Sequence, residues 1–126
     1  GQLIRGLHKM PILADKIDPK STETVDAVLY GDKTLDVSKA DPQKFWLGAG
    51  LANVPNRILM ADALGQAVKV TNKDVNGDGL TDAVFTFVQK DVAKRLVAGT
   101  SLHDVWLYGY AGDKRISTMD TVAVIK

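Results

Sequence analysis

The sequence contains no cysteine. Disulfide bonds, zinc sites built from thiolates and a cysteine nucleophile are therefore all excluded. A domain that folds without disulfides needs either an adequate core or another source of stability. A bound metal ion that favours the native state is one such source.

The sequence also lacks long hydrophobic runs and a marked excess of charge of one sign. No apolar run approaches the roughly 18 residues needed to cross a bilayer, so we expect no membrane insertion. Lysine and arginine together number 16 against 15 acidic residues, a net charge of +1. This near balance argues against a nucleic-acid partner, since such proteins usually carry a clear basic excess.

Histidine is scarce, and the sequence shows no convincing catalytic set. Its two histidines, His8 and His103, have no second histidine or glutamate at zinc-ligand spacing. Ser101 and His103, with an acid such as Asp104, leave a small hydrolase as a remote alternative. Neighbours along a strand point to opposite faces, however, so adjacency in sequence does not make a triad. The G-x-S-x-G motif is absent as well, and we therefore predict that the protein is not an enzyme.

What the sequence does contain is a globular composition and many strand signals. Its 126 residues, 45% of them hydrophobic, predict one domain over residues 1–126 with a real core. The chain starts at Gly1 rather than methionine, so we interpret it as a mature or excised fragment. Short segments with period-two alternation or β-rich composition, separated by turn signals, predict strands at 24–29, 44–47, 67–71, 83–88, 105–110 and 121–125.

This pattern predicts a mainly all-β fold, an antiparallel β-sandwich. Residues 91–98 are expected to form a short helix, and residues 50–65 a long connection with at most one helical turn. Three of the prolines, Pro19, Pro42 and Pro55, are expected where strands stop, because proline cannot donate to a ladder. Lys90, Lys94 and Arg95 are expected on a solvated face.

The most informative segment is the acidic loop, which we define as residues 74–82 and which reads D-x-N-x-D-G-x-x-D. Calcium takes six to eight oxygen ligands at about 2.3–2.6 Å. We predict a calcium site in which side-chain oxygens come from Asp74, Asn76, Asp78 and Asp82, the last directly or through water, and a backbone carbonyl from Leu80. Water or a further carboxylate from Asp32, Asp36 or Asp41 would complete the shell.

The spacing of the acidic loop is also compatible with an EF-hand and with a metal-free turn. An EF-hand requires a glutamate at position 12, but that position is Phe85, inside a predicted strand. Asn76-Gly77 and Asp78-Gly79 are also typical of metal-free hairpin turns. A plain hairpin needs only one such dipeptide and no acids at both ends. Magnesium is less favoured than calcium because it prefers a rigid octahedron with retained waters.

Four aromatic residues leave a choice between core and surface. Trp106, Tyr108 and Tyr110 share one face if their segment is extended, and Trp46 lies on another predicted strand. Core packing is the ordinary explanation, because aromatic side chains bury large areas. An exposed platform that binds sugar is the alternative.

Three stretches resemble repeat-type modules of bacterial exported proteins that carry a D-x-[DN]-x-D-G-x-x-D loop. They read DPKSTETVDAVLYGDKTLDVSKADPQKFWLG, KDVNGDGLTDAVFTF and DVWLYGYAGDKRISTMDTVAVI, and together they extend over residues 16–125. The resemblance implies an immunoglobulin-like β-sandwich in a secreted or cell-surface protein, with calcium held by Asp74, Asn76, Asp78 and Asp82. The chain departs from the pattern in its asparagine at the third loop position and its long segment 50–65.

These observations lead to an expected function. We expect a non-catalytic, calcium-binding accessory module that provides spacing, adhesion or presentation to a protein or glycan partner. A carbohydrate-binding module attached to a secreted hydrolase is the second alternative.

Overall fold

A computed structural model describes residues 11–31, 33, 35–50, 63–112 and 114–126 of the chain. Its strands are β1 (Lys16–Ile17), β2 (Thr24–Leu29), β3 (Ala40–Gly48), β4 (Leu64–Gln66), β5 (Lys69–Lys73), β6 (Asp82–Val88), β7 (Thr100–Ala111) and β8 (Lys114–Val124). The helical elements are the 3-10 helix η2 (Val37–Lys39), the short α-helix α2 (Gln89–Val92) and the 3-10 helix η4 (Ala93–Arg95).

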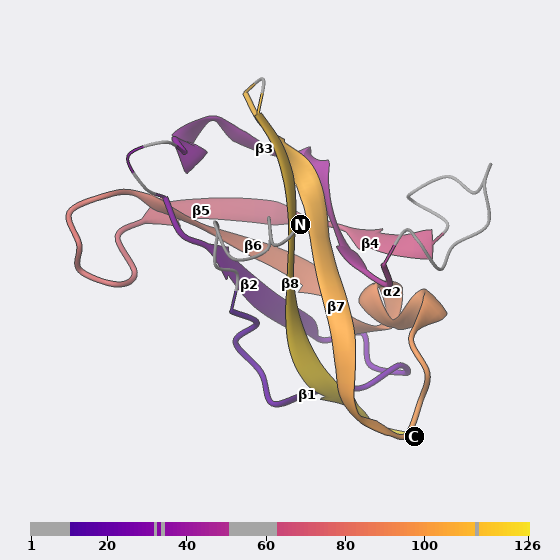
Figure 1. The fold of residues 1–126 in the computed structure, drawn as a ribbon. Helices are drawn as coiled ribbons and strands as arrows, with labels where there is room; N and C mark the ends of the chain where they lie inside the picture. Colours follow the sequence, from indigo (N-terminus) through magenta and orange to yellow (C-terminus); the bar gives the residue numbers. More distant parts are fainter. Residues whose placement is uncertain (1–10, 32, 34, 51–62, 113) are drawn as a thin grey trace.

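The strands form two sheets, which confirms the predicted all-β sandwich (Figure 1). One sheet has the order β1-β8-β7-β3-β4 and the other the order β2-β6-β5. All neighbours are antiparallel except β1 and β8, which run parallel. In an immunoglobulin-like sandwich the chain passes back and forth between two sheets, so that each sheet contains strands from several parts of the sequence. The strand orders of the two sheets agree with that arrangement.

Strand β6 is the centre of the smaller sheet and connects the acidic loop to α2. It pairs with β2 from Thr24↔Val88 to Leu29↔Ala83 and with β5 from Lys69↔Thr86 to Lys73↔Asp82. Six of its seven residues are buried. The acidic loop enters β6 at one end, and α2 follows directly at the other, so a span of about 20 Å, at about 3.4 Å per residue, separates them.

Three phenylalanines occupy the space between the sheets. Phe45 from β3 stacks on Phe85 from β6 with ring centroids 4.2 Å apart, and Phe87 lies 6.4 Å from Phe85. All three side chains are fully buried. Aromatic side chains bury large apolar areas, so this cluster supplies a large part of the core that holds the two sheets together.

The long hairpin of β7 and β8 extends well beyond its predicted segments. Its register runs from Thr100↔Val124 to Ala111↔Lys114, with an irregularity between Thr100 and His103. The sequence predicts the last strand only at 121–125, because the polar residues between Lys114 and Thr118 hide its alternation. Ile116 and Thr118 nevertheless point inward and are buried.

Some predicted element boundaries need correction. Pro42 lies within β3 rather than at a strand end, but the ladder with β7 shifts register between Ala40 and Phe45. The missing N–H of proline is tolerated at such an irregularity. The predicted strand 67–71 lies two residues later, as β5, and the predicted helix 91–98 is replaced by α2 and η4 over 89–95. Pro55 and most of segment 50–65 lie outside the described residues.

Candidate metal centre

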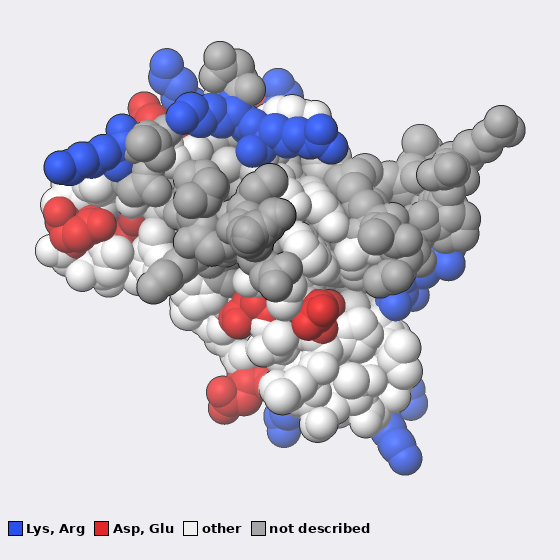
Figure 2. Space-filling view, in the orientation of Figure 1, with Lys and Arg blue, Asp and Glu red and all other residues white. Residues whose placement is uncertain are grey.

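The acidic loop closes the hairpin between β5 and β6. Lys73 and Asp82 form the last pair of that ladder, and the residues between them lie on the surface. In Figure 1 the loop projects at the left end of the molecule. Figure 2 shows acidic side chains gathered at the same end, beside lysine or arginine side chains. The loop is therefore open to solvent ions while both its ends are held by β-strands.

Asp74 organises the interior of the loop. Its Oδ1 accepts a hydrogen bond of 2.8 Å from the N–H of Gly77, and its Oδ2 accepts one of 2.8 Å from the N–H of Gly79. Both glycines have positive φ, 75° and 84°. Residues with a Cβ avoid this conformation, so the two glycines allow the chain to curl around the Asp74 carboxylate.

Asn76 and Asp78 each form a tight local turn. Asp78 Oδ1 accepts from the N–H of Leu80 at 2.9 Å, and Asn76 Oδ1 accepts from the N–H of Asp78 at 3.3 Å. These are the side-chain to backbone bonds that asparagine and aspartate favour in turns. They fix the exposed middle of the loop, from which the predicted oxygens of Asn76, Asp78 and Leu80 would come.

Asp82 differs from the other loop residues because its side chain is fully buried. Its Oδ1 accepts a hydrogen bond of 3.0 Å from the N–H of Gly31, and its Oδ2 accepts one of 2.8 Å from the N–H of Val75. A buried carboxylate is costly unless it is well hydrogen-bonded. Asp82 thus ties the loop both to its own start and to the segment that follows β2.

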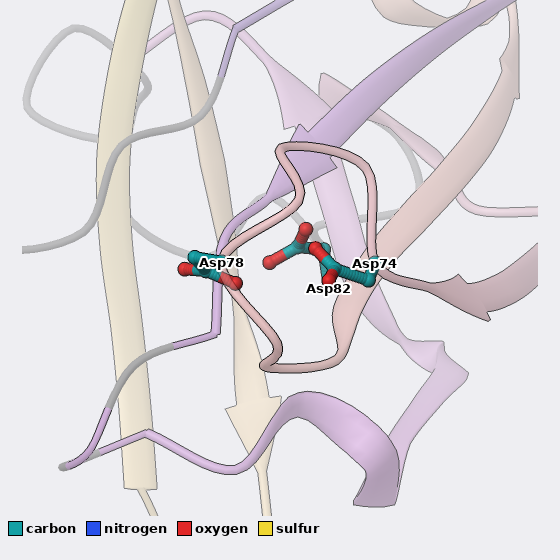
Figure 3. A group of neighbouring side chains, drawn as sticks. All are labelled: Asp74, Asp78 and Asp82. Atoms are coloured by element: carbon teal, nitrogen blue, oxygen red, sulfur yellow. The ribbon is translucent and has the colours of Figure 1, made fainter.

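The three carboxylates converge. One oxygen each from Asp74, Asp78 and Asp82 lies within 4.8 Å of the others. Asp74 and Asp82 lie next to each other, and Asp78 faces them across the loop (Figure 3). Oxygens bound to one calcium ion at about 2.3–2.6 Å are at most about 5 Å apart. The observed separation therefore fits a shared divalent cation, and oxygen-only ligands suit such an ion.

The hydrogen bonds within the loop do not compete with metal binding. An ionised carboxylate offers about four acceptor positions. Asp74 and Asp82 each use two of theirs on backbone N–H groups. A metal-free turn would form the same hydrogen bonds. It would not require the carboxylate of Asp78 to approach the other two.

Two of the predicted extra ligands, Asp36 and Asp41, do not join this cluster. Asp36 caps η2 by accepting hydrogen bonds from the hydroxyl and the N–H of Ser38, and the hydroxyl bond is the main reason its pKa is lowered. Asp41 accepts from the N–H of Gln43. Among the described acidic residues, only Asp74, Asp78 and Asp82 form a group of this kind. Asp32 lies outside the described residues.

The expectation that the four aromatics pack in the core is wrong. On β7 the buried residues are Val105, Leu107, Gly109 and Ala111. Because alternate residues face opposite sides of a strand, Trp106 and Tyr108 point outward with partial exposure, and Tyr110 is 45% exposed. Trp46 pairs with Tyr108 across β3 and β7 and is also only partly buried. Phenylalanines fill the core instead.

The residues of the hydrolase alternative are not arranged as a triad. The Nδ1 atom of His103 lies 2.9 Å from the backbone carbonyl of Asp104. A carbonyl only accepts, so Nδ1 carries the proton in this contact. In the described part of the chain, no hydrogen bond connects Ser101 to His103. A nucleophile and its base need such a contact.

No protein-family model matches the chain, and no curated protein matches it either. Over the described residues, no helix has both the length and the apolar character that crossing a membrane requires.

Proposed function

We propose that this chain is a non-catalytic, calcium-binding accessory domain of a secreted or cell-surface bacterial protein. The observation that carries the proposal is the approach of the Asp74, Asp78 and Asp82 carboxylates to within 4.8 Å at the end of a β-hairpin. Three like charges at this distance repel one another, and a divalent cation removes that repulsion.

Calcium suits the donor set better than other common ions. All the donors are hard oxygens, and calcium accepts variable numbers of them, including water. Asp74, Asp78 and Asp82 would hold the ion together with the Asn76 amide oxygen and the Leu80 carbonyl. Calcium would supply charge neutralisation and a cross-link between the two ends of the loop.

Such a site has a structural role. Asp82 connects the loop to the backbone beside Gly31, so ordering the loop also fixes the segment that follows β2. A weak site of about 10⁻⁴–10⁻³ M, typical of extracellular modules, would be filled outside cells and empty in a low-calcium compartment. The domain would then become rigid after export and serve spacing, adhesion or presentation of a partner.

Calorimetric melting provides the test. The protein is stripped with chelator and then melted with excess calcium, with excess magnesium and with chelator alone. The proposal predicts a higher melting temperature in calcium, with little effect of magnesium. The double variant Asp74→Asn/Asp78→Asn should lose the calcium effect, and Asp41→Asn, an exposed acid outside the cluster, should keep it. Equal melting temperatures in calcium and chelator would refute the proposal.

A further inference from the structure

A pocket of about 480 Å³ lies beside η4, which follows α2 beyond the end of β6 that is opposite the acidic loop. It is bounded by the start of β7, by η4 and by the residues that follow β3. This volume is within the range of about 300–1,000 Å³ that small-molecule sites occupy. Its apolar wall consists of Trp106 with Ala49, Val97 and Leu102, and its polar side chains are those of Arg95, Thr100, His103 and Asp104. Gly50 completes the lining. The pocket thus combines one large aromatic ring and smaller apolar side chains with several polar groups.

The indole of Trp106 is held in place as a wall of this pocket. Tyr108 lies parallel to it, with ring centroids 5.8 Å apart and planes inclined by 8°. Tyr108 supports Trp106 but does not line the pocket. On another side, a Cβ at Gly50 would come within 3.0 Å of the indole Nε1. The glycine therefore lets the backbone lie close to the ring.

The polar groups around the indole offer both donors and acceptors. Arg95 and Asp104 are exposed side chains with opposite charges. The Thr100 hydroxyl donates to the carbonyl of Val97, which leaves its oxygen free to accept. With the proton of His103 on Nδ1, its Nε2 is an acceptor in the neutral ring. One positive and one negative group give the pocket no strong preference for an ionic ligand.

We propose that this pocket binds a neutral pyranose sugar, as the terminal unit of a glycan. A pyranose ring has an apolar C–H face that packs on an aromatic ring and a rim of hydroxyls that both donate and accept hydrogen bonds. The indole of Trp106 can pack against the C–H face. The hydroxyls can form hydrogen bonds with the side chains of Arg95, Asp104, Thr100 and His103. The glycan partner of this domain would then be held at the end opposite the calcium loop.

The test uses the fact that the chain has only two tryptophans. In the Trp46→Phe variant, fluorescence reports Trp106 alone. The folded variant is titrated with cello-, manno-, xylo- and galacto-oligosaccharides, and the wild-type chain is applied to a glycan array. The proposal predicts retention of neutral glycans and a saturable change in Trp106 fluorescence with at least one of these series.

Matched variants show whether the glycan binds in this pocket or elsewhere on the outer face of the sheet. Trp106→Ala and, separately, Asp104→Asn should weaken the binding of the retained glycan by about tenfold or more, the scale of a central binding residue. Asp104 is exposed, so its variant tests the site even if Trp106→Ala does not fold. Tyr110→Ala, on the same face but outside the pocket, should bind normally.

Sugar binding measured in chelator distinguishes this proposal from the calcium proposal, because the pocket and the acidic loop lie beyond opposite ends of β6. Sugar binding that persists in chelator is expected whether or not the loop binds calcium. Silence of the array together with unchanged Trp106 fluorescence would overturn the sugar proposal. Retention of only sulfated or uronic-acid glycans, or binding unaffected by both pocket variants, would overturn it as well.

Discussion

The carboxylate of Asp82 accepts a hydrogen bond from the backbone N–H of Gly31, 51 residues earlier in the chain, over 3.0 Å. The other oxygen of the same carboxylate accepts from Val75 inside the acidic loop. One side chain thus links the candidate metal loop to the segment after β2. This contact makes Asp82 a structural residue as well as a predicted ligand, and its two roles can be separated by mutation.

Asp82→Ala should destabilise the domain even without calcium. It leaves the buried N–H of Gly31 without its acceptor, which costs about 1–3 kcal/mol in the free energy of unfolding. Urea denaturation in chelator measures the loss. Asp41→Ala, at an exposed site, should change the free energy of unfolding by no more than about 0.5 kcal/mol. Equal effects of the two substitutions would show that the Gly31 contact contributes nothing.

Asp74→Asn should reduce the stabilisation by calcium but leave the stability in chelator nearly unchanged. Its side chain lies in an exposed loop and its amide oxygen can still accept one hydrogen bond, so stability in chelator should change little. The stabilisation by calcium, about 2.7 kcal/mol when free calcium is about 100 times the dissociation constant, should be largely lost. Paired denaturation curves with calcium and with chelator measure both quantities. Full retention of the calcium effect would remove Asp74 from the ligand set.

Gly77→Ala should strain the loop. Gly77 has φ of 75°, and a left-handed conformation costs a residue with a Cβ about 1–2 kcal/mol. Gly112, at φ 64° in the turn after β7, is the matched control. Both substitutions should lower the melting temperature in chelator, but only Gly77→Ala should also weaken calcium binding. If Gly112→Ala weakened calcium binding equally, the effect would not come from the loop.

The inner and outer aromatics should differ sharply in their contribution to stability. Phe85→Ala removes a fully buried ring between the sheets and should cost about 3–5 kcal/mol. Tyr110→Ala removes a ring that is 45% exposed and should cost far less. Denaturation of both variants by urea tests this. A large loss for Tyr110→Ala would contradict its placement on the outer face.

Asp36 should titrate below the ordinary range of an aspartate. Hydrogen bonds from Ser38 lower its pKa, and Ser38→Ala should raise that pKa back towards the usual value. A lowered pKa in the folded state stabilises the protein above the unfolded pKa. This contribution disappears as the pH falls through the folded pKa. NMR titration of the Asp36 carboxyl in both proteins measures the shift, and identical titration curves would contradict the contribution of the Ser38 hydroxyl.

The sequence predicts the strands that are long enough to show a β pattern and misses the shortest ones. Residues 24–29 and 83–88 match β2 and β6 to within one residue, because the first segment alternates and the second is a short apolar run bounded by turn signals. Strands β1 and β4 have only two and three residues, too few to show any period. Their pairing depends on β8 and β3, which lie far away in the sequence.

The aromatics show a second limit of sequence reasoning. Alternation places Trp106, Tyr108 and Tyr110 on one face, and the structure confirms that they share it. Alternation does not say which face meets the other sheet. The small residues Gly109 and Ala111 indicate the inner face, since a Cβ at Gly109 would come within 2.4 Å of the Phe45 ring. Small residues opposite a large ring mark the inner face.

The acidic loop was predictable as a motif but not as a geometry. Spacing alone identified Asp74, Asp78 and Asp82, and the structure brings these three together. The burial of Asp82 and its bond to Gly31 depend on the packing of β2 against β6. No local pattern encodes such a contact.

Titration calorimetry of the chelator-stripped protein with calcium tests the proposed metal site most directly. We expect saturable binding of one calcium ion per chain, abolished in Asp74→Asn/Asp78→Asn and unchanged in Asp41→Asn. Heat of dilution alone, with no calcium found in the dialysed protein by elemental analysis, would contradict it.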